Sequence, residues 1–186
     1  MAEVVSIPLA LPLLLAMFLT WSFEIITFGM CINSYRGLNG NLKKDGADVG
    51  DVFSTDGVIT AVSGLTFCLT WLVLFMMYAS PMRVVRSFKV LAGVYWFLTL
   101  FLFATLIPYT QYVRKDRPEW YDGRNEEWPK AYKDYDYLVW ISIFGWIGWF
   151  FTFITACLLP AAASASQGYY TRRAYEEKAK AQPTQA

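Results

Sequence analysis

The sequence predicts an all-α fold, a four-helix transmembrane bundle of an integral membrane protein. Of the 186 residues, 56% are hydrophobic and 18% aromatic, and they gather in four long runs instead of alternating with polar residues. A run of about 20 residues with almost no charge matches the roughly 30 Å hydrocarbon core of a bilayer. Because backbone groups in lipid must bond within their own segment, such runs are expected to be helices.

Four membrane-spanning helices are expected in order along the chain. The first follows a start, Met1 to Val5, that lacks the basic residues of a secretory signal. Its apolar run is also longer than the core of a cleaved signal, so we expect it to remain as an anchor. The predicted helices cover about residues 7–31, 57–79, 90–110 and 138–161.

Polar segments separate these helices. Two long loops, 32–56 and 111–137, are predicted on one face of the bundle, and the first is rich in Gly, Asn, Asp and Lys. A short connection with Arg83 and Arg86 lies on the other face, with the two termini. Residues 1–167 are therefore interpreted as the four-helix domain, and 168–186 as a basic, partly disordered tail whose first part could continue the fourth helix.

Charge on the two faces bears on the orientation in the membrane. Lys and Arg number nine in the loops and seven on the other face, which by count alone favours cytoplasmic loops. The short connection and the tail are nevertheless basic, whereas the two loops contain eleven acidic residues. We therefore expect both termini in the cytosol.

Glu24 is the ionisable residue well inside an apolar run. A carboxylate within a membrane is costly and is a functional candidate by default. One hypothesis is a small proton-coupled transporter that uses Glu24. The other is structural: Glu24 lies near the loop-facing end, where it could reach headgroups or bond Tyr and Trp donors of the other helices.

Small residues recur at helical spacing in the second and fourth helices. In lipid, helices associate through van der Waals packing at small residues that let backbones approach closely. These residues are interpreted as packing positions inside the bundle or as a surface for self-association through the fourth helix. They are Gly57, Ala61 and Gly64 in the second helix, and Ser142, Gly145, Gly148 and Thr152 in the fourth.

The second loop interleaves charges with aromatic residues. Such side chains dominate protein interfaces, so the loop is a candidate partner-binding segment, or else a solvated cap on the bundle. Its candidate contact residues are Arg117, Trp120, Tyr121, Arg124 and Trp128. Four aspartates of the first loop, at 45, 48, 51 and 56, lack the alternate-residue spacing of a calcium loop. No metal site is expected.

Aromatic residues follow the third and fourth helices. Tyr95 and Trp96, with Trp140, Trp146 and Trp149, form bulky ridges beside the small residues. A sterol or another lipid could lie between these helices. Aromatics near the helix ends, such as Tyr78 and Tyr109, fit the belts that Trp and Tyr form at membrane interfaces.

Missing residue types exclude several functions. The chain has no histidine, which rules out histidine acid–base catalysis and histidine ligation of metals or haem. It also lacks a Cys-x-x-Cys pair and a phosphate-binding Gly-Lys-Ser/Thr loop. We therefore expect no enzyme and no cofactor. A net charge of +1 gives no reason to expect a nucleic-acid partner.

The layout of four helices, two polar loops on one side, a short basic connection and a small basic tail resembles the MARVEL-type tetraspan proteins. The resemblance covers most of the chain and is architectural. It implies a non-enzymatic protein that associates laterally with itself or other membrane proteins, in the plasma membrane or endomembranes. Such a protein organises membranes, acts as a self-assembling scaffold, or is a small subunit of a larger complex.

Overall fold

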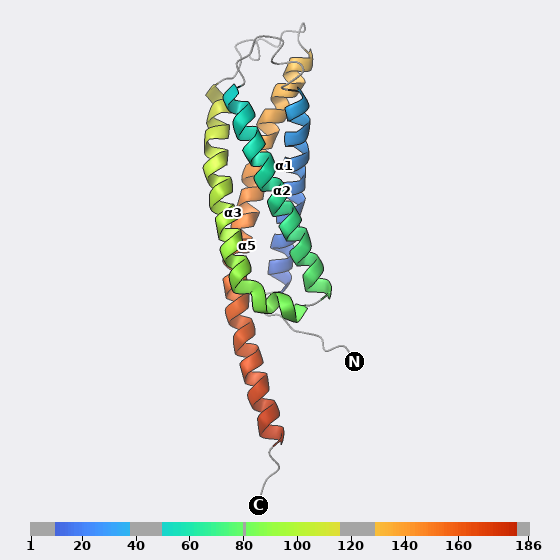
Figure 1. The fold of residues 1–186 in the computed structure, drawn as a ribbon, viewed down its shortest axis with the longest axis vertical. Helices are drawn as coiled ribbons and strands as arrows, with labels where there is room; N and C mark the ends of the chain where they lie inside the picture. The colour runs from blue at the N-terminus through green and yellow to red at the C-terminus, as the bar shows by residue number, and fades with distance from the viewer. Residues whose placement is uncertain (1–9, 38–49, 80, 116–128, 182–186) are drawn as a thin grey trace, which may run out of the picture.

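The computed structural model describes residues 10–37, 50–79, 81–115 and 129–181, and these residues are all helical (Figure 1). The described part of the chain forms the predicted four-helix bundle. Its helices are α1 (Ala10–Gly37), α2 (Gly50–Ala79), α3 (Pro81–Lys115) and α5 (Pro129–Ala181).

Each of these helices contains a stretch that is long and apolar enough to cross a membrane. The stretches have 24 to 28 residues, or about 36 to 42 Å at roughly 1.5 Å per residue. Their outer surfaces carry large apolar side chains, which water would disfavour and acyl chains accept. The chain is thus a multi-pass membrane protein, with candidate spans Leu11–Ser34, Thr55–Ala79, Ser87–Gln111 and Leu138–Ala165.

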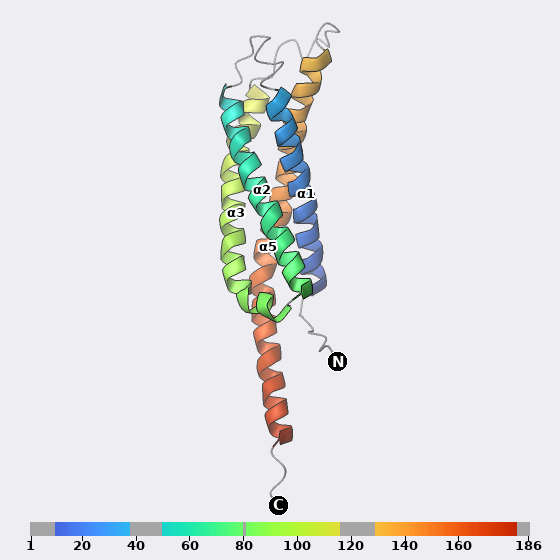
Figure 2. The same ribbon diagram turned by 45° about the vertical axis from the view of Figure 1, so that its right-hand side comes forward.

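The helices are longer than the apolar runs that predict them. α2 begins at Gly50 instead of residue 57, and α3 begins at Pro81, so most of the short basic connection is helical. α5 continues past the bundle to Ala181 (Figures 1 and 2). Hydrogen bonds within the helix do not stop where hydrophobicity stops, so a polar segment next to a span can continue the helix.

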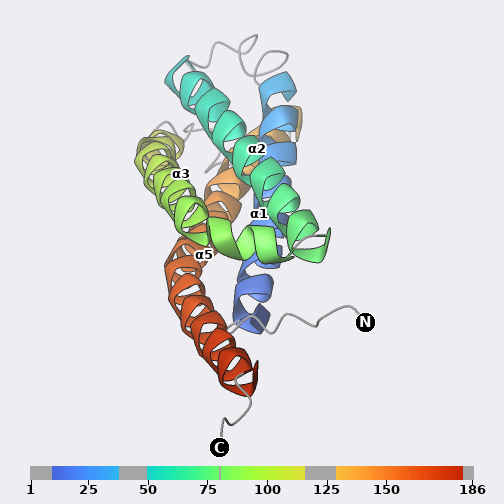
Figure 3. The ribbon, with the colours of Figure 1, turned by 60° about the horizontal axis from the view of Figure 1, so that its bottom comes forward.

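The helices pack in a ring, in which α1 and α3 each lie beside α2 and α5. α1 begins and α5 leaves the bundle at the same end, called here the tail-facing end; the other is the loop-facing end (Figure 1). At the tail-facing end the first turns of α3 run across the bundle before the helix turns along it (Figure 3).

One face of every helix is buried along a seven-residue repeat. This 3.5-residue average spacing is typical of left-handed bundles, in which neighbouring helices cross at about 20°. It keeps one stripe of each helix turned toward the centre over the whole membrane thickness. The buried positions alternate three and four residues apart: 13, 17, 20, 24, 27, 31 and 34 in α1; 56, 59, 63, 66, 70, 73 and 77 in α2; 88, 92, 95, 99, 102, 106, 109 and 113 in α3; and 138, 141, 145, 148, 152, 155, 159 and 162 in α5.

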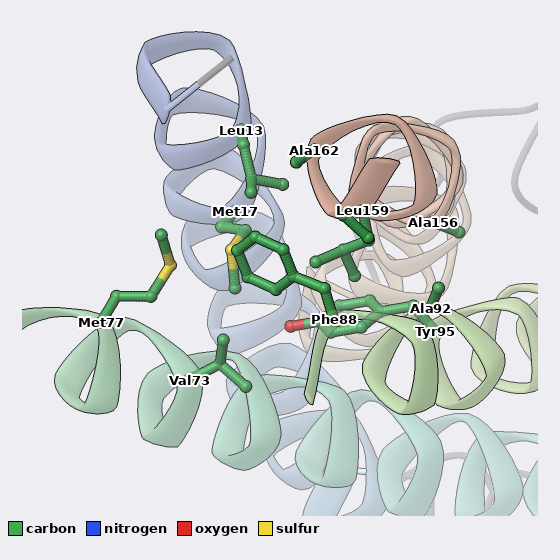
Figure 4. Packing of buried hydrophobic residues seen from close by; sticks show 11 residues of the cluster. Leu13, Met17, Val73, Met77, Phe88, Ala92, Tyr95, Ala156, Leu159 and Ala162 are labelled. Carbon is green, nitrogen blue, oxygen red and sulfur yellow. The ribbon is translucent and has the colours of Figure 1, made fainter. Parts of the chain in front are cut away.

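The two ends of the core differ in chemistry. At the tail-facing end all four helices contribute apolar side chains to one cluster (Figure 4): Leu13, Met17, Val73, Met77, Phe88, Ala92, Tyr95, Ala156, Leu159, Ala162 and Ala163. Further toward the loops, the buried faces of α1 and α2 become polar, with Thr20, Glu24, Thr27, Ser34, Asp56, Ser63, Thr66 and Thr70. The candidate site lies in this polar part.

Candidate functional site: a buried acid between three helices

Glu24 lies in the middle of the bundle, on the buried face of α1. Its side chain is 1% exposed. It precedes Ser34, the end of the α1 span, by ten residues, or about 15 Å at roughly 1.5 Å per residue. Thr152 Oγ1 of α5 donates a hydrogen bond to Glu24 Oε1 over 3.3 Å. Glu24 therefore joins α1 to α5 near the middle of the candidate span of α1.

This geometry corrects the structural interpretation of Glu24 made from the sequence. A side chain buried at this depth does not reach the headgroups, and its hydrogen-bond donor is a threonine instead of a tyrosine or tryptophan. The error came from measuring depth against the end of the apolar run. Because the candidate span of α1 ends at Ser34 instead of Cys31, Glu24 lies deeper than the run suggests.

Gly148 makes room for the Glu24 carboxyl on α5. A Cβ at this glycine would lie 2.9 Å from Glu24 Oε1 and 3.6 Å from Cβ of Phe23. Any side chain there would press against the carboxyl. Gly148 and Thr152, four residues apart, thus form one surface of α5 that fits Glu24 in both shape and hydrogen bonding.

Ser63 of α2 completes the surroundings of the carboxyl. Its side chain is fully buried and faces Glu24. The Ser63 hydroxyl makes no hydrogen bond, however, and neither does Glu24 Oε2. Two polar groups therefore face each other in the core with hydrogen-bonding capacity to spare.

Asp56 is a second buried acid, near the loop-facing end. It is 0% exposed, both of its carboxyl oxygens lack a hydrogen bond, and its side chain faces the buried thiol of Cys31. Glu24 and Cys31 are seven residues apart on α1, as are Asp56 and Ser63 on antiparallel α2. The two pairs therefore stack along one interface, which we call the α1–α2 polar face: Glu24, Cys31, Asp56 and Ser63.

The sequence analysis placed Asp56 at the end of the first loop. In the structure Asp51 and Asp56 belong to α2, and Asp45 and Asp48 lie outside the described residues. Among the residues that are described, no group of three or more acidic or cysteine side chains could hold a metal ion. Asp56 instead faces the neighbouring helix.

The small residues divide between the inside and the outside of the bundle. Gly64 lies against Phe28 of α1, and Gly145 lies against Leu106 of α3. Ser142, Gly145, Gly148 and Thr152 of α5 are all buried. Gly57 and Ala61 of α2 instead lie on the outer surface. The bundle thus uses the small residues of α5 for its own packing and leaves two of those on α2 exposed.

Aromatic side chains bind α3 to α5. Trp146 Nε1 donates to Thr110 Oγ1 over 2.9 Å, and Trp149 Nε1 donates to the Thr99 carbonyl over 3.1 Å. Phe103 contacts both indoles, with ring centroids 5.8 and 5.4 Å away. These rings lie at the interface between α3 and α5. The sterol or other lipid that the sequence analysis considered between these helices stays a prediction.

Two tyrosines that the sequence analysis placed at an interfacial belt or on a helix ridge are buried in the structure. Tyr109, expected in an interfacial belt, is fully buried and donates to the Leu138 carbonyl over 3.4 Å. Tyr95, expected on a bulky ridge, is also buried, and its hydroxyl lies 2.8 Å from Thr70 Oγ1. Tyr78 is exposed, as a belt residue would be. The loop candidates Arg117, Trp120, Tyr121, Arg124 and Trp128 lie outside the described residues.

Sequence reasoning missed Asp56 and Ser63 as members of the site. A signal for them existed, because polar residues on α1 and α2 recur at intervals of three and four, in phase with the seven-residue repeat. In a membrane bundle, polar residues at this spacing mark the buried face. A search for apolar runs passes over that pattern.

Comparisons with protein-family models, curated proteins and solved structures found no match for this chain. The similarity to MARVEL-type tetraspan proteins stays a prediction. Function is therefore argued from the residues themselves. A carboxyl, two hydroxyls and a close glycine at mid-membrane can bind a proton and hold three helices together.

Proposed function

We propose that this protein is a non-enzymatic tetraspan membrane protein that acts by lateral association with copies of itself, as a membrane organiser or self-assembling scaffold. The supporting observation is that Gly57 and Ala61, four residues apart, lie on the outer surface of α2. Small residues at this spacing let a second helix approach closely in lipid, where the hydrophobic effect contributes little to helix pairing.

The surface around this pair is suited to another helix. A Cβ at Gly57 would have no heavy atom within 4 Å, so the space beside its backbone is open. Leu65, Cys68 and Leu72 continue the same exposed stripe toward the tail-facing end. We call Gly57, Ala61, Leu65, Cys68 and Leu72 the outer α2 stripe.

The fourth helix is a weaker candidate for self-association than its composition suggests. Gly145 and Gly148 face Leu106 and Glu24 inside the bundle, so they are occupied by internal packing. A large side chain at either glycine would disturb packing inside the bundle, so its effect could not be assigned to association between copies. Cys157 and Ala161, also four residues apart, do lie on the outside of α5 and form a competing surface near the tail-facing end.

The cysteines provide probes for these two surfaces. Cys68 lies on the outer α2 stripe, Cys157 lies on the outside of α5, and Cys31 is buried. Cys68 is seven residues from Ala61, or about 10 Å along the helix. In a symmetric pair that crosses near Ala61, two copies of Cys68 fall within reach of a short bifunctional maleimide.

The test is cross-linking in native membranes with that reagent. We expect the Cys157→Ser variant, which keeps Cys68, to give covalent dimers, and the Cys68→Ser variant to give none. Ala61→Leu should remove the dimers, whereas Gly93→Leu, at an exposed α3 glycine with open space around it, should not. Dimers that form through Cys157 alone, or that persist in Ala61→Leu, would contradict the assignment to α2.

The mass of the gently extracted protein tests the wider proposal. A regular oligomer, or a fixed set of co-purifying membrane proteins, supports an organiser or a subunit of a larger complex. A monomer without partners contradicts both. Location in the plasma membrane or endomembranes, with both termini in the cytosol, belongs to the same proposal and is supported by the basic Arg83 and Arg86 on the terminal side.

A further inference from the structure

The α1–α2 polar face contains more hydrogen-bonding capacity than the core satisfies. Glu24 Oε2, Ser63 Oγ and both carboxyl oxygens of Asp56 are buried without a hydrogen bond. Taking a charged carboxylate out of water into a protein core costs several kcal/mol unless an opposite charge and hydrogen bonds compensate it. Functional membrane carboxyls are commonly proton-relay groups.

We infer that Glu24 is a proton-binding site at mid-membrane, which exchanges its proton with the loop-facing side along the α1–α2 polar face. This inference concerns the interior of the bundle and does not depend on lateral association. It assigns the buried acid a ligand, the proton, and a direction of access.

Hydrogen bonding at Thr152 supports a protonated Glu24. Thr152 Oγ1 lies 3.3 Å from Glu24 Oε1 but only 2.8 Å from the Gly148 carbonyl. A threonine hydroxyl has a single hydrogen, and the shorter contact is the better place for it. That one hydrogen cannot serve both acceptors at once. Whenever it lies on the Gly148 carbonyl, the donation from Thr152 to Glu24 is lost, and the hydroxyl can instead accept a hydrogen from Glu24. Only the carboxylic acid form of Glu24 can donate it.

The groups around Glu24 offer no counter-charge. Ser63 of α2 and Thr152 of α5 face the carboxyl and do not ionise in this range. The nearest ionisable groups of the α1–α2 polar face, Cys31 on α1 and Asp56 on α2, would add negative charge, and the Tyr95 hydroxyl of α3 is engaged with Thr70. The buried polar side chains of the described residues include no lysine or arginine. A proton is thus the simplest way to neutralise Glu24.

The direction of access follows from what lies on each side of Glu24. Toward the loop-facing end, Cys31 and Asp56 lie seven residues along α1 and α2, or about 10 Å further out. At this depth an apolar cluster joins Leu106, Tyr109 and Ile141 of α3 and α5 to Ile59 of α2 and the Cys31 thiol of α1. The ionisable groups that face each other here, Cys31 and Asp56, therefore belong to α1 and α2.

Toward the tail-facing end, the apolar cluster closes the bundle. Leu13, Met17, Phe88 and Leu159 are fully buried and point toward one another across the axis (Figure 4). The Thr20 and Thr155 hydroxyls, 3.1 Å apart, form a further polar contact between α1 and α5 on this side of Glu24. Exchange through this end would require the apolar cluster to open.

The first experiment uses dicyclohexylcarbodiimide, which reacts with protonated carboxyl groups in apolar surroundings. The full-length protein in phosphatidylcholine vesicles is labelled across a pH series, and the adduct is located by peptide mass spectrometry. We expect labelling at Glu24 that falls about tenfold per pH unit above a midpoint, as the protonated fraction falls. Absence of labelling at Glu24, or a rate that does not change with pH, would overturn the inference, as would protection by sodium ions at fixed pH.

A second measurement starts from the wild-type protein and then compares two variants. Infrared difference spectra of the wild-type protein between acid and alkaline buffer should show the carbonyl band of a buried carboxylic acid. Glu24→Gln should remove the Glu24 component of that band, and Asp56→Asn should leave the Glu24 component in place but slow its appearance after a pH jump. In sealed vesicles of known orientation, a pH jump on the loop-facing side should change the Glu24 band faster than a pH jump on the tail-facing side. Equal rates from both sides, or an unchanged rate in Asp56→Asn, would overturn the proposed direction.

Discussion

Replacing Gly148 with alanine should weaken the bundle, because the added methyl group would meet the Glu24 carboxyl. The new Cβ would lie 2.9 Å from Glu24 Oε1 and 3.2 Å from its Cδ, whereas ordinary contacts begin at 3.4 Å. The carboxyl would therefore have to retreat by about 0.5 Å in a close-packed interior. The retreat would also lengthen the 3.3 Å contact with Thr152.

The size of the effect follows from opposing contributions. Overpacking a buried site costs about 1 to 3 kcal/mol, and a side-chain hydrogen bond in a membrane protein contributes about 0.6 kcal/mol. Alanine favours the helix over glycine by up to about 1 kcal/mol. We expect Gly148→Ala to lower the free energy of unfolding by about 1 to 2 kcal/mol.

The assay is unfolding of the purified protein in mixed micelles, followed by circular dichroism as the denaturing detergent increases. Gly93→Ala is the matched control, because its Cβ would meet no heavy atom within 4 Å, and it should be neutral or slightly stabilising. In a Glu24→Ala background the carboxyl is gone, so Gly148→Ala should no longer destabilise. Equal stability of the two glycine variants, or the same loss in both backgrounds, would refute the reasoning.

Three further outcomes are expected. Thr155→Val should lower the free energy of unfolding by about 0.6 kcal/mol. Adding Thr20→Val should lower it little further, because the two hydroxyls bond each other. If the two losses add in the unfolding titration, the pairing is contradicted. Tyr95→Phe should lower the free energy of unfolding by no more than Thr155→Val does, because the Thr70 hydroxyl keeps its 2.7 Å hydrogen bond to a carbonyl of its own helix. A loss of several kcal/mol in the same titration would contradict this expectation. Ending the chain after Gln167 removes the part of α5 that extends beyond the bundle (Figure 1), so helix content should fall while the unfolding midpoint stays; a lower midpoint would show that this segment stabilises the bundle.

Hydrophobic runs located the spans but not the ends of the helices. The expected second helix began at residue 57, whereas α2 begins at Gly50 and so includes Asp56. The difference changed the interpretation of that aspartate from a loop residue to a buried one. Run length records where lipid contact ends, and helix length depends on backbone hydrogen bonds that continue beyond it.

Glu24 was found from the sequence, but its partners were not. A single acid in an apolar run is visible without a structure, because charge in lipid is rare. Thr152 lies 128 residues further along the chain. Its pairing with Glu24 depends on how α1 and α5 rotate about their axes, and no local pattern in either run fixes that rotation.

The sequence by itself determined the four membrane spans and their helical state, since a bilayer leaves an apolar segment few other ways to satisfy its backbone. It also marked Glu24 as unusual. The tertiary structure decided which small residues face inward, so that Gly148 receives Glu24 while Gly57 and Ala61 remain on the surface. In lipid, apolar side chains suit either face of a helix, so hydrophobicity cannot say which face is buried. Close contacts between small and polar side chains make that choice, and they form only when the helices meet.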